Sequence, residues 1–86
     1  MNLVDGESVT IPSAWGIRGF SVLNLATSTD NATINGGTAL PDGVVSENNI
    51  IIPGGSRSWS APNNGWLVGM VITAGASCTV QIQFLL

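Results

Sequence analysis

The sequence predicts an all-β protein: a small antiparallel β-sandwich or jelly-roll-like barrel of about 6–8 short strands. Three observations favour this class. No window shows apolar residues at a helical period, whereas several short segments alternate apolar and polar side chains. Turn-forming residues are dense, with 11 glycines and 4 prolines between these segments. The length of 86 residues is that of one small domain, and we expect residues 1–86 to form it.

Turn signals divide the chain into short strands. Asn35-Gly36-Gly37 predicts a tight turn, because these residues tolerate positive φ, and we expect a loop from Thr38 to Gly43. The three consecutive isoleucines at 50–52 favour a strand that is buried on both faces. The serines at even positions of 56–61 share one face of a strand, opposite Trp59. The expected strands are residues 7–11, 15–25, 32–35, 48–52 and 56–61, with two more in 65–86.

The longest apolar region, residues 65–86, predicts a C-terminal hairpin. Its apolar residues alternate at period two on either side of Ala74-Gly75-Ala76. An odd-length loop there places Val68 and Val80 on the same face, whereas a two- or four-residue loop pairs the other parity with Val80. We prefer the odd loop because it separates apolar from polar side chains better. The expected core face then carries Trp66, Val68, Met70, Ile72, Cys78, Val80, Ile82 and Phe84.

The opposite face of this hairpin retains large aliphatic side chains. Each such side chain forgoes about 1.5–3 kcal/mol if it stays in water, and a contiguous patch typically marks a partner surface. The alternative is a thicker fold that covers both faces of the sheet. The candidate subunit interface consists of Leu67, Val71 and Leu85, with Leu23 and Leu25 from the strand at 15–25.

Charge is scarce in this chain. Two arginines, no lysine and five acidic residues give a net charge of −3, which argues against nucleic-acid binding because phosphate contacts need clustered Lys and Arg. Charged residues make up 8% and apolar residues 44%, a poor surface for a monomer. Either Ser, Thr, Asn, Gln and Gly form the polar surface or other subunits cover much of it; we expect both, and therefore a homo-oligomer. We expect no membrane partner, because no stretch approaches the roughly 18 apolar residues of a membrane helix. The N-terminus lacks the features of a signal peptide, so we expect synthesis in the host cytoplasm without processing.

The residue types also argue against catalysis. The chain has no His, no Lys and no Tyr, and Cys78 is its one cysteine, so we expect no enzyme, no metal site and no cofactor. Asp5, Asp30 and Asp42 lie in expected turns, where Asp is favoured for its local hydrogen bonds. Cys78 lies on an apolar face and is expected to be a small buried hydrophobe.

Two tryptophans suggest a binding function. Trp59 and Trp66 flank a polar loop, and together they can form a stacking platform for a glycan, with Asn63 and Asn64 as hydrogen-bonding groups. The competing interpretation is that both tryptophans pack against the core or across a subunit boundary, where Trp is enriched.

Two segments resemble a known group of proteins: NNIIIPGGSRSWSAP, residues 48–62, and NGWLVGMVITAGASCTVQIQFLL, residues 64–86. A strand ending in Pro-Gly, a Ser-rich strand with an aromatic, an Asn-Gly turn and a closing amphipathic hairpin are similar to small β-sandwich virion proteins of tailed bacteriophages. Such proteins decorate or cement capsids, or form head and tail attachments, often as trimers. The resemblance implies a structural role in a virion, contacts with other virion proteins, and no catalytic residue. A carbohydrate-binding module that uses its surface tryptophans is the alternative function.

Overall fold

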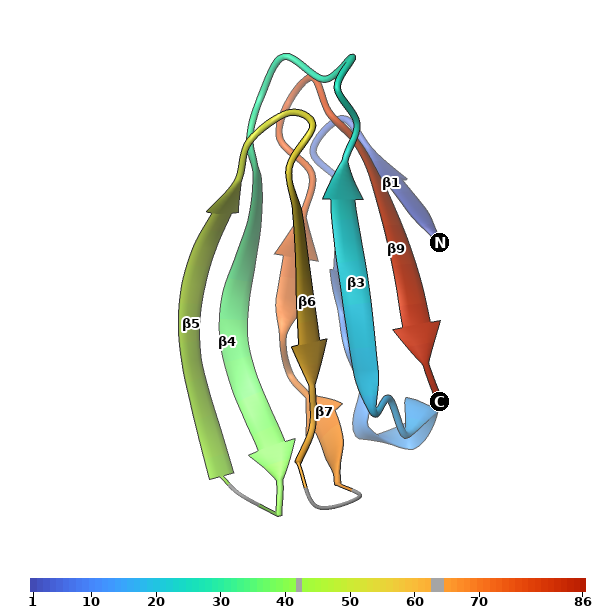
Figure 1. The fold of residues 1–86 in the computed structure, drawn as a ribbon, viewed down its shortest axis with the longest axis vertical. Coiled ribbons are helices and arrows are strands. Elements are labelled where there is room, and N and C mark those ends of the chain that lie inside the picture. Colours follow the sequence, from blue (N-terminus) through green and yellow to red (C-terminus); the bar gives the residue numbers. More distant parts are fainter. Residues whose placement is uncertain (42, 63–64) are drawn as a thin grey trace.

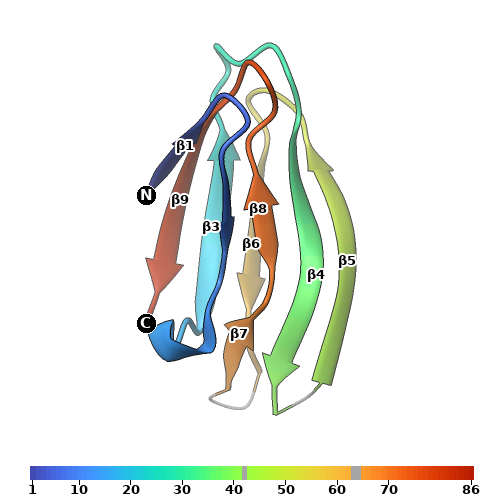
Figure 2. The same ribbon diagram turned by 180° about the vertical axis from the view of Figure 1, so that it is seen from behind.

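The computed structural model describes residues 1–41, 43–62 and 65–86, and of residues 45–48 it describes the backbone. In this part the chain is all-β, and its two antiparallel sheets pack face to face as a β-sandwich (Figures 1 and 2). A short 3-10 turn, η1 (Ser13–Trp15), joins β2 to β3, and none of the described helices is long and apolar enough to cross a membrane. The strands are β1 (Asn2–Val4), β2 (Ser8–Thr10), β3 (Gly19–Asn24), β4 (Ala32–Leu40), β5 (Gly43–Ile51), β6 (Ser56–Ser60), β7 (Trp66–Val68), β8 (Val71–Thr73) and β9 (Thr79–Leu85).

The strand order is that of a jelly roll. Sheet A has the order β1-β9-β3-β6, and sheet B has the order β2-β8-β4-β5 with β7 also paired to β4. Because β8 pairs with residues 33–35 of β4 and β7 with residues 38–40, β7 and β8 form one interrupted line beside β4. Each sheet is therefore four strands wide, as in an eight-stranded jelly roll. This confirms the predicted fold class.

The core lies between the two sheets and is complete in a single chain. The accessible surface is 4635 Å² for a mass of 8.8 kDa. A compact monomer of this mass is expected to expose about 4,800 Å², so the fold encloses its core as well as an ordinary monomer does. The larger side chains that are almost fully buried include Ile11, Ile17, Val22, Ile34, Ile51, Leu67, Met70, Ile72 and Val80.

The predicted C-terminal hairpin is wrong, because its two halves lie in different sheets. β8 belongs to sheet B and β9 to sheet A, and the residues between them form an arch from one sheet to the other. Val80 is fully buried on the inner face of sheet A, while Val68 is half-buried on the outer face of sheet B, so the predicted register is also wrong. The cause is Gly69, whose φ of 81° interrupts the line between β7 and β8. Leu67 therefore faces inward before the break, and Ile72 faces inward after it.

The predicted turn at Asn35-Gly36-Gly37 is wrong as well. These residues lie inside β4, where the pairing with β5 shifts its register between Asn35 and Gly37. A Cβ atom on Gly37 would overlap the carbonyl oxygen of Val68 and lie 2.5 Å from the amide nitrogen of Met70. Glycine is therefore needed here because two strands approach closely at the Gly69 break, and not because the chain turns.

Two other expectations need correction. Ile50 and Ile51 end β5, an edge strand of sheet B, and Ile52 follows it. Only Ile51 of the three is buried; Ile50 is 60% and Ile52 is 63% exposed. The expected strand at 15–25 is shortened to β3, since η1 occupies its first residue. The expectation for β6 is confirmed: its serines are exposed, and Trp59 packs against the core.

Candidate functional site

The predicted subunit interface does not form one surface. Leu67 is 1% exposed and belongs to the core, so its assignment to an interface was wrong. The physical reason is the positive φ of Gly69, which interrupts the alternation of side chains. Odd-numbered Leu67 faces the core before Gly69, and even-numbered residues face it afterwards. Val71 is half-buried on the outer face of sheet B, whereas Leu85 and Leu23, 61% and 37% exposed, lie on the outer face of sheet A. Leu25 is half-buried just after β3.

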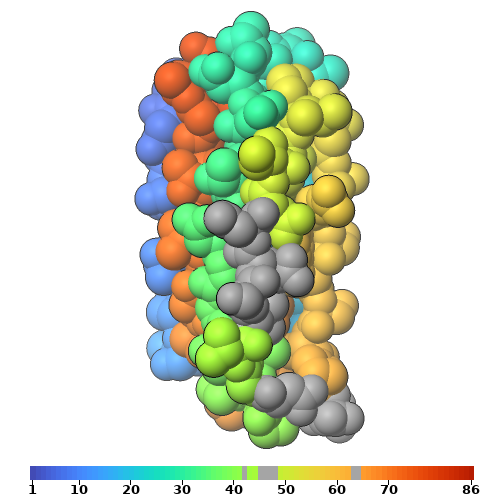
Figure 3. Space-filling model, turned by 90° about the vertical axis from the view of Figure 1, so that its left-hand side faces the viewer, coloured from blue at the N-terminus to red at the C-terminus, as the bar shows by residue number. Residues whose placement is uncertain are grey.

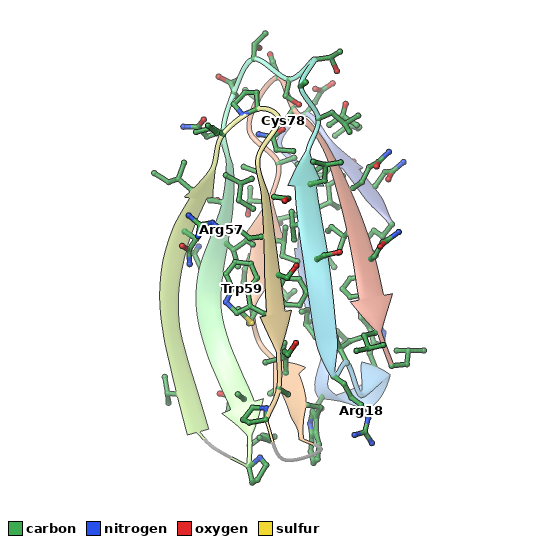
Figure 4. The ribbon with its side chains drawn as sticks, in the orientation of Figure 1. Arg18, Arg57, Trp59 and Cys78 are labelled. Carbon is green, nitrogen blue, oxygen red and sulfur yellow. The ribbon has the colours of Figure 1, made fainter. Side chains whose placement is uncertain are left out.

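The tryptophans of the predicted glycan platform are also separated. Trp59 is half-buried and packs against the core from β6, with its ring stacked on Phe20 at a centroid distance of 5.3 Å (Figure 4). Trp66 is 40% exposed on the outer face of sheet B. One ring therefore faces the inside of sheet A and the other faces away from sheet B. Asn63 and Asn64 lie outside the described residues.

Figure 3 shows the outer face of sheet B with β4 and β5 in the middle, and the strand pairing places apolar side chains together in the lower half of this face. Its lower half places Trp66 beside Leu40, and Val68 beside Thr38, which in turn pairs with Val44. Val44 is 83% exposed, the largest exposed fraction among the large apolar side chains that the structure describes. None of the described side chains on this face carries a charge.

The outer face of sheet A is polar but uncharged in the described residues. Serines of β3 and β6 lie beside Gln81 and Gln83 of β9. Because Gly19 has no side chain, the surface sinks there into a hollow of about 290 Å³ between β6 and β9. The hollow is bordered by Ser58, Ser60 and Leu85. It is shallow and has no aromatic ring on its outer side.

A second hollow lies at the end of the sandwich where η1 meets β9. Its volume is about 440 Å³, and its lining is apolar: Met1, Trp15, Ile17, Phe84 and Leu86. Trp15 is 42% exposed, and its ring meets the ring of Phe84 edge-on at a centroid distance of 5.6 Å. The sequence analysis did not single out this hollow. Its residues are far apart in the chain, and the exposed Trp15 gave no local sign of its contact with Phe84.

The acidic side chains whose positions are described support local structure at the opposite end of the sandwich. Asp30 accepts a hydrogen bond on Oδ2 from the backbone N–H of Ser77 at 2.9 Å, and Glu7 accepts one from the N–H of Val4 at 2.8 Å. Asp5 has a φ of 45° in the turn after β1. These are the turn roles that the sequence predicted for Asp5 and Asp30. Asp42 lies outside the described residues.

Cys78 lies at this same end, where β9 begins (Figure 4). It is 2% exposed, and its thiol donates a hydrogen bond to the carbonyl oxygen of Asp30 at 2.8 Å. The expectation of a small buried side chain is confirmed. In the described part of the chain, no three His, Cys, Asp or Glu residues are grouped as a metal site.

Comparisons of this chain with models of protein families, with curated proteins and with solved structures found no match.

Proposed function

We propose that this chain is a non-enzymatic structural protein that forms homo-oligomers and attaches to a larger assembly, a bacteriophage virion, as a decoration, cement, head or tail protein. One observation carries the proposal: a complete core is combined with large apolar side chains on the outside. Val44, Leu85 and Leu86 are 83%, 61% and 76% exposed. The fold does not need these side chains, so a partner surface is the natural reason for their exposure.

The arrangement of these side chains supports the proposal further. Centres of protein interfaces are depleted in charged residues and enriched in Trp and other large apolar residues. On sheet B the pairing places Trp66 beside Leu40. Val68 is the next outward-facing residue of β7 after Trp66, so the three side chains form a continuous apolar surface. The described residues of both outer faces lack charge, which lowers the desolvation cost of covering either face.

The virion as the assembly rests on the resemblance of residues 48–86 to phage virion proteins, which also implies a trimer. The jelly roll is compatible with this role, because capsid proteins use it, but lectin domains use it too. A glycan-binding module is therefore the competing proposal. The arrangement of the aromatic rings favours it less, because Trp59 packs inward and leaves Trp66 alone on its face.

The test is the mass of the purified full-length chain in sedimentation equilibrium at 1–100 μM. We expect an oligomer that Trp66→Asp weakens, because the carboxylate would be buried in an apolar contact. Thr10→Asp is the matched control: Thr10 is exposed on the same sheet, on edge strand β2. Electron microscopy of native particles labelled with an antibody to the chain then identifies the assembly. A monomer over this whole range, together with unlabelled particles, contradicts the proposal.

A glycan array distinguishes the glycan-binding proposal from the structural one. Binding of a defined glycan by the wild type, with loss of binding in Trp66→Ala, would favour a lectin-like module over a structural subunit. The absence of any array signal, together with oligomers in sedimentation, would support the structural role.

A further inference from the structure

One edge of β9 is only partly covered. β1 pairs with residues 79–81 of β9, and Met1 extends this pairing by one residue: the N–H of Ile82 donates to the carbonyl of Met1 at 2.8 Å, and the Met1 amino group donates to the carbonyl of Ile82 at 3.0 Å. Figure 2 shows β9 continuing beyond the start of β1. The edge of β9 after Ile82 therefore has no neighbour from β1.

The backbone of Phe84 faces this uncovered edge. Successive residues of a strand direct their N–H and C=O groups to alternate sides, so Phe84 points its backbone to the same side as Ile82. The carbonyl of Leu85 points the other way, since it accepts the N–H of Arg18 at 2.7 Å beside β3. Among the described residues none pairs with the backbone N–H or C=O of Phe84 on the open side. A free pair of backbone groups on a strand edge is a site for another strand.

Apolar side chains surround these free groups on both faces of β9. On the inner side lies the hollow of about 440 Å³ whose lining includes Met1, Trp15 and Leu86. On the outer side Leu85 is 61% exposed; Leu86 follows β9 on the side of the hollow and is 76% exposed. An occupant that fits must be an extended segment with free backbone groups and with aliphatic side chains on both of its faces. The end of β9 has these properties itself.

We propose that two copies of this chain pair the ends of their β9 strands, antiparallel and about a two-fold axis at Leu85; this rests on the homo-oligomer of the proposed function. In this register Phe84 lies opposite Leu86 of the second copy. The two residues exchange both backbone hydrogen bonds, and the symmetry repeats the exchange on the other side of the axis. Sheet A then continues from one copy into the other.

The same register covers both exposed leucines. Leu85 faces Leu85 of the second copy in a non-hydrogen-bonded pair, where opposite Cα atoms are about 4.5 Å apart and side chains touch. Leu86 of each copy lies across from Phe84 of the other, on the side of the strand that the apolar hollow occupies. One pairing thus satisfies the free backbone groups, covers part of the hollow and shields Leu85 and Leu86 of each copy from water.

A contact of this kind has consequences for the assembly. An isologous two-fold contact makes even-numbered assemblies: a dimer, or a hexamer if a three-fold contact exists elsewhere on the subunit. It is incompatible with a trimer as the complete oligomer. The mass of the wild type is therefore the first measurement.

The decisive experiment uses the fact that Leu85 faces itself. Leu85→Asp and Leu85→Lys each place two like charges opposite one another, so each variant alone should show a dissociation constant raised about tenfold or more. An equimolar mixture of the two variants should recover the pairing, because Asp then faces Lys. Gln81→Asp is the matched control, since Gln81 is exposed on the same face of the same strand but is flanked there by Asn2 of β1.

The outcomes separate this inference from the proposed function. A wild type that stays monomeric overturns the two-fold contact, and it overturns the proposed function as well if the native particles are also unlabelled. A wild type that is trimeric, or an oligomer that Trp66→Asp dissociates and Leu85→Asp leaves intact, overturns the two-fold contact and leaves the structural role standing. An even-numbered oligomer that Leu85→Asp weakens, Gln81→Asp spares and the mixture restores supports the contact.

A covalent readout checks the geometry without relying on affinity. Two Leu85→Cys chains would bring their Cα atoms within the 4.4–6.8 Å range that a disulfide spans. We expect oxidation to convert most of this variant to a covalent dimer on a non-reducing gel. Gln81→Cys should stay monomeric on the gel. Equal cross-linking of the two variants would overturn the register.

Discussion

The side chain of Asn24 in β3 donates a hydrogen bond to the carbonyl oxygen of Ile51 in β5 at 2.9 Å, and so joins sheet A to sheet B. The same amide donates to the carbonyl of Asp30 at 3.1 Å, in the connection between β3 and β4. The backbone of Asn24 also pairs with the turn after β5, through Gly54 and Gly55. This fully buried residue therefore holds two connections of the jelly roll together at one end of the sandwich.

We predict that Asn24→Ala destabilises the fold by about 1–3 kcal/mol, because it leaves the buried carbonyl of Ile51 without its donor. The carbonyl of Asp30 loses one donor and keeps the thiol of Cys78. The carboxamide oxygen of Asn24 accepts no hydrogen bond from the described residues, so removing it breaks no hydrogen bond. Denaturation in urea measures the change. Asn35→Ala, on the exposed face of β4, is the control and should stay within about 0.5 kcal/mol of the wild type. An equal effect of the two substitutions would show that Asn24 does not join the sheets.

Gly37→Ala should destabilise the protein by about 3 kcal/mol or more, since the new methyl group meets backbone atoms of Val68 and Met70 that cannot rotate away. The control is Gly16→Ala, where the Cβ atom has open space and only the φ of 58° is unfavourable, at a cost of about 1–2 kcal/mol. Thermal unfolding should resolve the difference, because 1 kcal/mol moves the midpoint of a domain of this size by about 4–8 °C. If Gly37→Ala unfolds at the same temperature as Gly16→Ala or at a higher one, β4 does not approach the backbone around Gly69 as closely as the structure shows.

The two tryptophans of β6 and β7 should differ in their effect on stability. Trp59→Ala removes a half-buried ring that stacks on Phe20 at 16° between ring planes, and we expect a loss of about 2–4 kcal/mol. Trp66→Ala removes a ring from the outer face and should cost less than about 1 kcal/mol in the monomer. Guanidinium unfolding at low protein concentration measures both. If the order is reversed, Trp66 is part of the core and not of a contact surface.

Self-association should depend little on salt. The described outer faces carry no charged side chain, so raising NaCl from 0.05 to 1 M should change the dissociation constant by less than about threefold. Ammonium sulfate should strengthen association, because it favours burial of apolar surface. Sedimentation across these conditions provides the measurement. A tenfold weakening in NaCl would point to ion pairs at the interface instead.

Local patterns predicted the strands that lie in one sheet with one face inward. β9 alternates at period two and buries Val80 and Ile82 on one parity, while β6 exposes its serines and half-buries Trp59. The same reasoning failed where a glycine changes the phase or permits close packing. Asn35-Gly36-Gly37 has the composition of a turn, and only the crossing line of β7 and β8 explains why it lies inside β4.

The candidate site was predicted only in part, because its residues meet through pairings between distant parts of the chain. The sequence identified Leu85 and Trp66 as contact residues, and both are exposed. It did not identify the hollow between Trp15, Met1 and Phe84. No local pattern relates Met1 to Ile82, although their backbones are hydrogen-bonded.

By itself, the sequence determined that the protein is all-β, because alternation at period two and frequent turn residues are local properties. The tertiary structure decided which side of each strand faces the core. Leu67 and Leu85 look alike in the sequence, as odd-numbered leucines in apolar strands, yet one is 1% and the other 61% exposed. The reason is that alternation specifies only that neighbouring side chains point to opposite faces. The face that is buried depends on the sheet that each strand joins and on the positive φ of Gly69, which shifts the phase between them.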